Sequence, residues 1–138
     1  MAFSQYLADK ILVWVKGTTF PTALSTVFVS LHSGDPGTAG TSNNVQSTIT
    51  GSANRTSVTT STFSTVGSAP GGGFQITNNN SVQITTNAAG GATVTYFGVW
   101  DAVTGGNFLA SGQLTTSVDV VAGDTVQFNA GALAIRLV

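Results

Sequence analysis

The sequence predicts an all-β fold: an antiparallel β-sandwich or jelly roll of short strands with one N-terminal α-helix. Short runs rich in β-branched and aromatic residues recur along the chain, and Gly, Asn, Asp and Ser separate them at close, fairly even spacing. Only one segment shows the periodicity of an amphipathic helix. At 138 residues the chain is expected to form one domain over residues 1–138, burying roughly two-thirds of its unfolded surface.

The helix is expected over residues 4–16. Ser4 can cap its first turn, Lys16 suits the negative end of the helix dipole, and Gly17 can adopt the left-handed conformation that stops a helix. Because a helix of this length is marginal alone, it needs a surface to lie on. We expect that surface to be the sheet core of its own chain, with a neighbouring subunit as the alternative. Its apolar stripe consists of Phe3, Leu7, Ile11, Trp14 and Val15.

A strand is predicted over residues 26–32, where apolar and small polar side chains alternate. It ends in a turn of Ser, Gly, Asp and Pro over residues 33–37. Residues 38–52 consist mostly of Gly, Ser, Thr and Asn, with isolated Val45 and Ile49, and predict a long surface loop. Long loops in compact domains are often interaction elements.

Shorter apolar segments predict further strands, separated by turns rich in Gly and Asn. The densest pattern is a hairpin, because its two apolar arms flank a segment of Asp, Gly and Asn that supplies turn chemistry. Its arms are residues 94–100 and 108–114. The other strands are expected at residues 55–63, 74–76, 81–85, 118–121, 125–128 and 133–138.

The charge content restricts the classes of partner. Charged residues make up 7% of the chain, against about 25% in a typical protein, and the net charge is −1. Little electrostatic repulsion therefore keeps copies apart, which suits a protein that packs against copies or partners; a bias of composition is the alternative. A nucleic-acid partner is not expected, because the four basic residues are scattered: Lys10, Lys16, Arg55 and Arg136.

A membrane partner is not expected either. Asp9 and Lys10 interrupt the only apolar candidate segment, and the run from Ile11 to Val15 is far too short to span a bilayer. We expect a soluble, unprocessed protein. The chain has no cysteine, which excludes disulfides and thiolate metal sites.

Candidate catalytic and metal-binding residues are few. His32 is the only histidine and is expected to end a strand and bond a loop carbonyl, since Asp35 alone does not complete a metal site. Asp35 is expected to form a turn, and Asp101 and Asp124 are expected to bond backbone amides in turns. A catalytic pair with Asp119 is not expected. We therefore expect no enzyme, no cofactor and no metal. The aromatic side chains can stack on sugars, but core or interface positions are favoured for them: Tyr6, Trp14, Tyr96 and Trp100.

Three parts of the chain resemble a known family. The segment from Tyr96 to Leu109, which reads Tyr-Phe-Gly-Val-Trp-Asp-Ala-Val-Thr-Gly-Gly-Asn-Phe-Leu, resembles small virion proteins of tailed bacteriophages. So do residues 122–135 near the end and residues 29–37 near the front. The resemblance extends over nearly the whole chain and is weakest between residues 38 and 92.

This resemblance implies a β-sandwich structural protein located in the virion and assembled in the host cytoplasm. Our first expectation is a capsid cement or decoration protein that binds capsomer junctions and stabilises the shell. The alternatives are a tail component (fibre, tip or collar) and a virion-surface module that binds a receptor or glycan. The partner would be the major capsid protein or, in the alternative, tail proteins, and a homo-oligomer is expected, with a trimer favoured.

The interface is expected on the helix and on the loop of residues 38–52, with one contribution from the hairpin. The residues expected there are Tyr6, Lys10, Trp14, Val45, Ile49 and Trp100.

Overall fold

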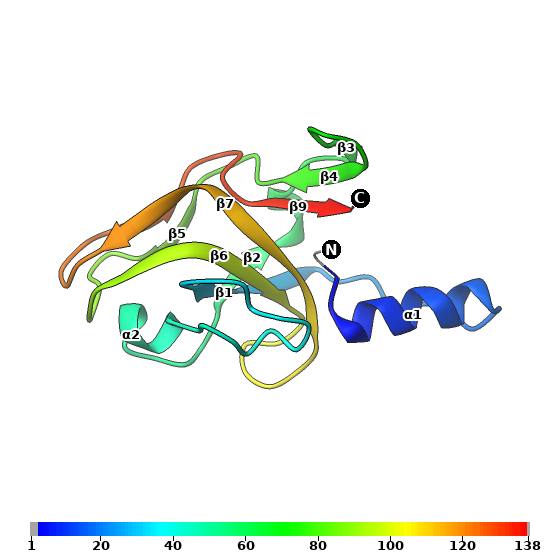
Figure 1. Ribbon diagram of the computed structural model, residues 1–138, viewed down its shortest axis with the longest axis horizontal. Helices are drawn as coiled ribbons and strands as arrows, with labels where there is room; N and C mark the ends of the chain where they lie inside the picture. Colours follow the sequence, from blue (N-terminus) through cyan, green and yellow to red (C-terminus); the bar gives the residue numbers. More distant parts are fainter. Residues whose placement is uncertain (1–2, 138) are drawn as a thin grey trace.

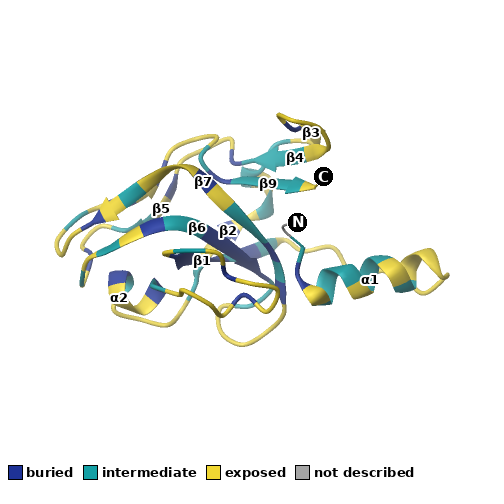
Figure 2. Ribbon diagram, in the orientation of Figure 1, coloured by how far each residue is buried: buried dark blue, intermediate teal, exposed yellow. Residues whose placement is uncertain are grey.

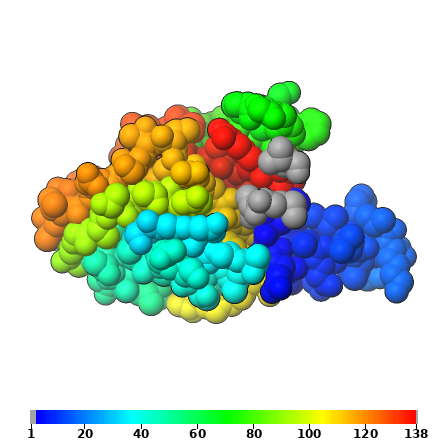
Figure 3. Space-filling model, viewed as in Figure 1, coloured from blue at the N-terminus to red at the C-terminus, as the bar shows by residue number. Residues whose placement is uncertain are grey.

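The computed structural model describes residues 3–137, which form a β-rich body with one helix projecting from it (Figure 1). All strand pairs are antiparallel, which confirms the predicted fold class. The helix and the connector after it stand out at one end of the molecule (Figure 3). The shape therefore separates a compact body from an extension.

The largest sheet has four strands in the order β2-β1-β6-β7. The expected hairpin is present as β6 and β7, with Trp100 opposite Phe108 and Tyr96 opposite Gln113. The prediction of a separate strand at residues 118–121 is wrong. Strand β7 continues into this segment through the exposed threonines and serine before it, because no turn residue interrupts them. The strands are β1 (Thr26–His32), β2 (Thr56–Thr59), β6 (Ala92–Trp100) and β7 (Phe108–Val120).

Two smaller sheets pack against the main one. The first has the order β3-β4-β9 and the second pairs β5 with β8. One buried cluster joins the layers, with Phe97 and Leu31 from the main sheet, Val82 from β5 and Val126 from β8. The strands are β3 (Gly67–Ser68), β4 (Phe74–Thr77), β5 (Val82–Thr85), β8 (Val126–Phe128) and β9 (Ala134–Leu137). Within this body, buried residues concentrate on β1 and β6 (Figure 2).

Helix α1 (Gln5–Val15) lies within one residue of the predicted bounds at each end, with Ser4 and Lys16 as its capping residues. The amide of Leu7 donates to the Ser4 hydroxyl at 3.0 Å, and Gly17 takes a left-handed φ of 103°. The expectation that the apolar stripe packs on its own sheet core is wrong, since no residue of α1 is buried (Figure 2). The helix contacts the main sheet at β7, and the Ser4 amide just before it donates to the Leu109 carbonyl at 3.1 Å.

The segment of residues 38–52 is not a free surface loop. It contains a short helix, α2 (Gln46–Thr50), and β1 holds it in place. The Val45 amide donates to the Leu31 carbonyl at 2.9 Å, and the Gln46 side chain accepts from the Leu31 amide at 3.2 Å. Because β2 pairs with β1 only as far as Val29, these bonds satisfy the strand edge beyond it.

The core makes a stability prediction. Leu31 is fully buried, so Leu31→Ala removes packed apolar volume and is expected to lower the free energy of unfolding by about 2–5 kcal/mol. Val66→Ala is the control, since Val66 is 70% exposed and its change is expected to stay within about 0.5 kcal/mol. Urea denaturation measures both, and an equal effect of the two substitutions would contradict this assignment of the core.

Candidate functional site

Three of the expected interface residues lie together on α1. Lys10 and Tyr6 are half-buried, with the Lys10 ammonium 5.4 Å from the centroid of the Tyr6 ring. Lys10 also pairs with the Asp9 carboxylate at 3.5 Å. Trp14 is 58% exposed, so a partner can reach it directly.

The other three residues lie in the β-body. Ile49 is completely buried and Trp100 is 7% exposed, so burial removes both from the candidate interface. Ile49 points into the core because α2 turns its one apolar side chain inward. Val45 is partly buried against the same core and offers little surface to a partner.

An apolar surface extends along α1 and the connector that follows it. Leu12 and Val15 are 69% and 72% exposed, and the Trp14 ring lies edge-to-face against Phe20 with centroids 6.3 Å apart. A groove of about 490 Å³ lies where the helix meets the connector, and its walls include Tyr6, Leu7, Phe20, Pro21, Leu24 and Leu109. We call Leu12, Trp14, Val15 and this groove the α1 surface. Contiguous exposed apolar surface of this kind marks interaction sites.

Arg55 covers Trp100. The Arg55 guanidinium carbon lies 3.6 Å from the centroid of the Trp100 ring, and the same guanidinium donates to the carbonyls of Ala102 and Gly105, each at 2.8 Å. Phe108 packs nearby, with ring centroids 5.0 Å apart. The indole is therefore occupied by its own chain and is not a platform for a sugar.

The aspartates in turns behave as expected. Asp35 accepts from the Gly37 amide at 2.8 Å, and Asp124 accepts from the Val121 amide at 2.9 Å. Asp101 accepts from the backbone amide of Asn107 at 2.6 Å, which closes the hairpin loop. These bonds confirm the turn roles predicted for the three aspartates.

The prediction for His32 is also confirmed, because His32 is the last residue of β1 and its ring bonds a loop carbonyl. Since a carbonyl oxygen only accepts, Nδ1 of His32 carries the proton and donates to Ser42 O at 2.8 Å. Nε2 then accepts from the Ser30 hydroxyl at 2.7 Å, and that hydroxyl accepts from Nε1 of Trp100 at 3.0 Å. This chain of hydrogen bonds attaches the segment after β1 to the centre of the main sheet.

The burial of His32 in this chain of hydrogen bonds predicts that the stability of the fold depends on pH. Burial lowers the pKa of His32 below its ordinary value of 6.5, and Arg55 also lowers it, although the Ser42 bond and Asp35 act in the opposite direction. Because the unfolded chain then binds the proton more tightly, the contribution of neutral His32 is fully present above about pH 6.5 and declines as the pH falls below it. Urea unfolding between about pH 7.5 and pH 5.5 measures this decline. His32→Gln is expected to abolish the slope, and an unchanged slope in that variant would assign it to another group.

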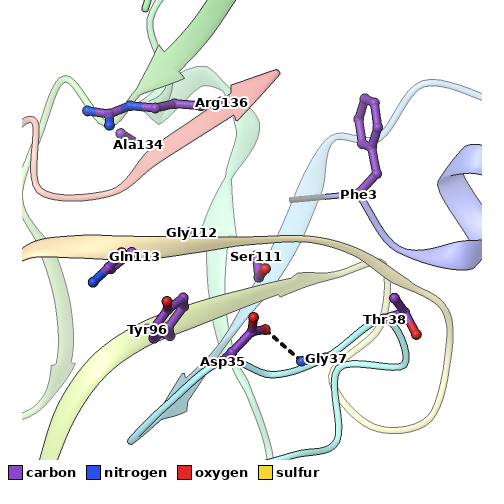
Figure 4. A pocket seen from close by; sticks show the side chains of 10 residues that line it. All are labelled: Phe3, Asp35, Gly37, Thr38, Tyr96, Ser111, Gly112, Gln113, Ala134 and Arg136. Atoms are coloured by element: carbon purple, nitrogen blue, oxygen red, sulfur yellow. Dashed lines mark hydrogen bonds between the residues drawn. The ribbon is translucent and has the colours of Figure 1, made fainter. Parts of the chain in front are cut away.

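A polar pocket of about 370 Å³ lies at β7, with lining residues from β6 on one side of that strand and from β9 on the other (Figure 4). Five separate segments line it: the chain before α1, the loop after β1, and strands β6, β7 and β9. The only hydrogen bond drawn among its lining residues joins Gly37 to Asp35 (Figure 4). We call this the polar pocket; its lining residues are Phe3, Asp35, Gly37, Thr38, Tyr96, Ser111, Gly112, Gln113, Ala134 and Arg136.

Among residues 3–137, no group of three or more His, Cys, Asp or Glu side chains lies close enough together to hold a metal ion. No helix in that range has the length and hydropathy to cross a membrane. The described chain thus offers two candidate sites of different chemistry, the apolar α1 surface and the polar pocket.

Sequence reasoning missed the polar pocket and the Arg55 stack, because each joins segments that are far apart in the chain and share no motif. The exposure of α1 had a signal in the sequence. Leu12, Val13, Trp14 and Val15 are consecutive apolar residues, and a helix that packs on one side cannot bury four in a row.

Comparison with known proteins supplies the remaining finding. The chain matches a family model described as podophage GP4 fiber I protein gp80, over residues 2–136. No curated protein matches the chain significantly. The family match includes both the β-body and α1.

Proposed function

This chain belongs to the podophage GP4 fiber I protein gp80 family, and from that premise we propose that it is a fibre component of a phage tail. At the coarser level it is a structural protein of a tailed phage and its location is the virion. The family description supports the tail-component alternative over the capsid cement role that we expected first. The proposed role is binding rather than catalysis.

The observation that carries the mechanism is the exposure of α1. Leu12, Trp14 and Val15 are each more than half exposed on a helix that buries none of its residues. Complete burial of one such side chain contributes about 1.5–3 kcal/mol, so their burial on a partner favours association strongly enough to offset part of its entropic cost. We expect α1 to anchor this protein in the fibre.

The partner that fits α1 best is a second copy of the chain. One molecule carries both the projecting apolar helix end and the apolar groove beside it, so each of two copies can offer apolar surface to the other. With a net charge of −1, copies repel each other little. Symmetric assembly multiplies modest contacts. The trimer implied by the resemblance is the state that we propose. Docking on another tail protein is the alternative.

Substitutions on α1 test this assembly in the particle. The double variant Leu12→Ser and Val15→Ser is expected to fold normally, because both side chains are exposed, and to be lost from virions. The control pair is Val66→Ser and Val121→Ser, at 70% and 61% exposure on other parts of the surface. Mass spectrometry of purified particles, complemented with each variant, measures the copies incorporated.

Three results decide the proposal. The wild-type chain and the control are expected at a low copy number set by the symmetry of the tail. The copy number of the α1 variant is expected to fall at least tenfold, which corresponds to a loss of about 1.4 kcal/mol of binding free energy. A copy number comparable with that of the major capsid protein would favour cement instead. Retention of the α1 variant at the wild-type level would reject α1 as the anchor. Light scattering of the purified chain separates self-assembly from docking on another protein.

A further inference from the structure

We propose that α1 forms a parallel three-helix coil with the α1 helices of two further copies, around a threefold axis. This inference rests on the fibre role proposed above and adds the geometry of the contact between copies. The α1 surface allows two modes of contact: the helix end of one copy in the groove of the next, or helix against helix. The pattern of residues along α1 favours the second mode.

A stripe on one side of α1 has the spacing of a coiled-coil seam. Such a seam advances by alternating steps of three and four residues, at positions named a and d. The stripe advances by three, four and three residues, so its first and third members take position a and its second and fourth take position d. We call it the outer stripe; its members are Gln5, Ala8, Leu12 and Val15. Leu12 and Val15 are 69% and 72% exposed, so their own chain leaves this part of the seam uncovered.

The contacts of α1 with its own chain use a different side of the helix. Leu7 lines the groove beside the connector, and the Trp14 ring packs edge-to-face on Phe20. Leu7 and Trp14 are seven residues apart and share one side, roughly a third of a turn from the outer stripe at 3.6 residues per turn. A partner on the outer stripe therefore leaves these internal contacts intact.

The charged residues of α1 and its cap lie outside the outer stripe. Lys10 takes position f, on the opposite side of the helix, while Asp9 and Lys16 take position e at the border of the stripe. Between parallel helices, an e residue lies beside a g residue of the neighbour, and Ile11 is the g residue that faces Lys16. Like charges therefore do not meet between copies, and the Lys16 methylenes can cover Ile11.

The residue types favour more than two helices. Leu at a with a β-branched residue at d shifts coiled coils from dimers to trimers or tetramers, and Leu12 and Val15 have this order. A closed trimer needs one contact repeated around a threefold axis, which parallel helices supply and antiparallel helices do not. Helix α1 stands clear of the β-body (Figures 1 and 3), so three bodies can surround the axis at the N-terminal end of the helices.

The coil is short, because α1 supplies only two a positions and two d positions. Helices of this length are marginal in water on their own. Bodies held side by side in the fibre raise the effective concentration of their helices, which then complete the coil. The assembled particle is therefore the place to test the contact.

Single cysteines test the coil in purified particles. The chain has no cysteine, so each variant carries one thiol. Ala8→Cys and Val15→Cys place it at a d position, and Lys10→Cys is the matched control on the opposite side of the same helix. We use a bifunctional maleimide whose reach is below the rise of about 10 Å between residues 8 and 15. It is expected to link copies of Ala8→Cys to each other and copies of Val15→Cys to each other, and to leave Lys10→Cys unlinked.

The number of linked chains tests the threefold axis. A trifunctional maleimide is expected to join copies of Ala8→Cys into covalent trimers, seen on a denaturing gel. Products that stop at two chains would contradict the trimer. Both d variants keep the test valid if one of them is poorly incorporated, because cysteine is small and apolar and Val15 is exposed.

Three further results would overturn the coil. They are linking of Lys10→Cys as efficient as that of the d variants, linking of neither d variant, and linking only between Ala8→Cys and Val15→Cys in particles that carry both, which indicates antiparallel helices. Mass spectrometry of the same particles separates this proposal from the fibre role. Absence of the wild-type chain from the tail would reject the fibre role, whereas variants that are incorporated and do not link would reject the coil alone.

Discussion

Helix α1 carries more apolar surface than its own chain covers, because Leu12, Trp14 and Val15 are each more than half exposed. Only the segment before the helix bonds to the sheet, where Ser4 donates to the Leu109 carbonyl. An isolated helix of 11 residues is below the length of about 12–15 that is marginal in water. Its capped start and the Trp14–Phe20 contact stabilise it within the chain, and burial on a partner is the further contribution that we propose.

The β-body is, by contrast, closed by its own polar contacts. Gln46 and Val45 satisfy the open edge of β1, while His32 and Ser30 connect the loop after β1 to Trp100. Every one of these groups is hydrogen-bonded within the chain, so none of them needs a partner molecule to satisfy it. Most residues that line the polar pocket belong to the β-body, whereas the exposed side chains of Leu12, Trp14 and Val15 lie on the projecting part.

Local chemistry explains which features were predictable from the sequence. Ser4, Gly17 and the aspartates act through bonds to neighbours a few residues away, so their roles follow from the sequence alone. Arg55 over Trp100 joins positions distant in the chain, and the burial of Ile49 depends on how α2 meets β1, so neither followed from local patterns. The polar pocket forms only where five separate segments meet. The sequence does not show which segments lie side by side, so the pocket could not be predicted from it.

Amide hydrogen exchange of α1 in the isolated chain and in the purified virion tests the central claim most directly. The account predicts rapid exchange of residues 5–15 in the dilute chain and strong protection in the particle, because the helix is completed by a partner. Amides of β6 at the centre of the main sheet are the internal reference and are expected to be protected in both states. Equal exchange of α1 in the chain and in the particle would contradict the account.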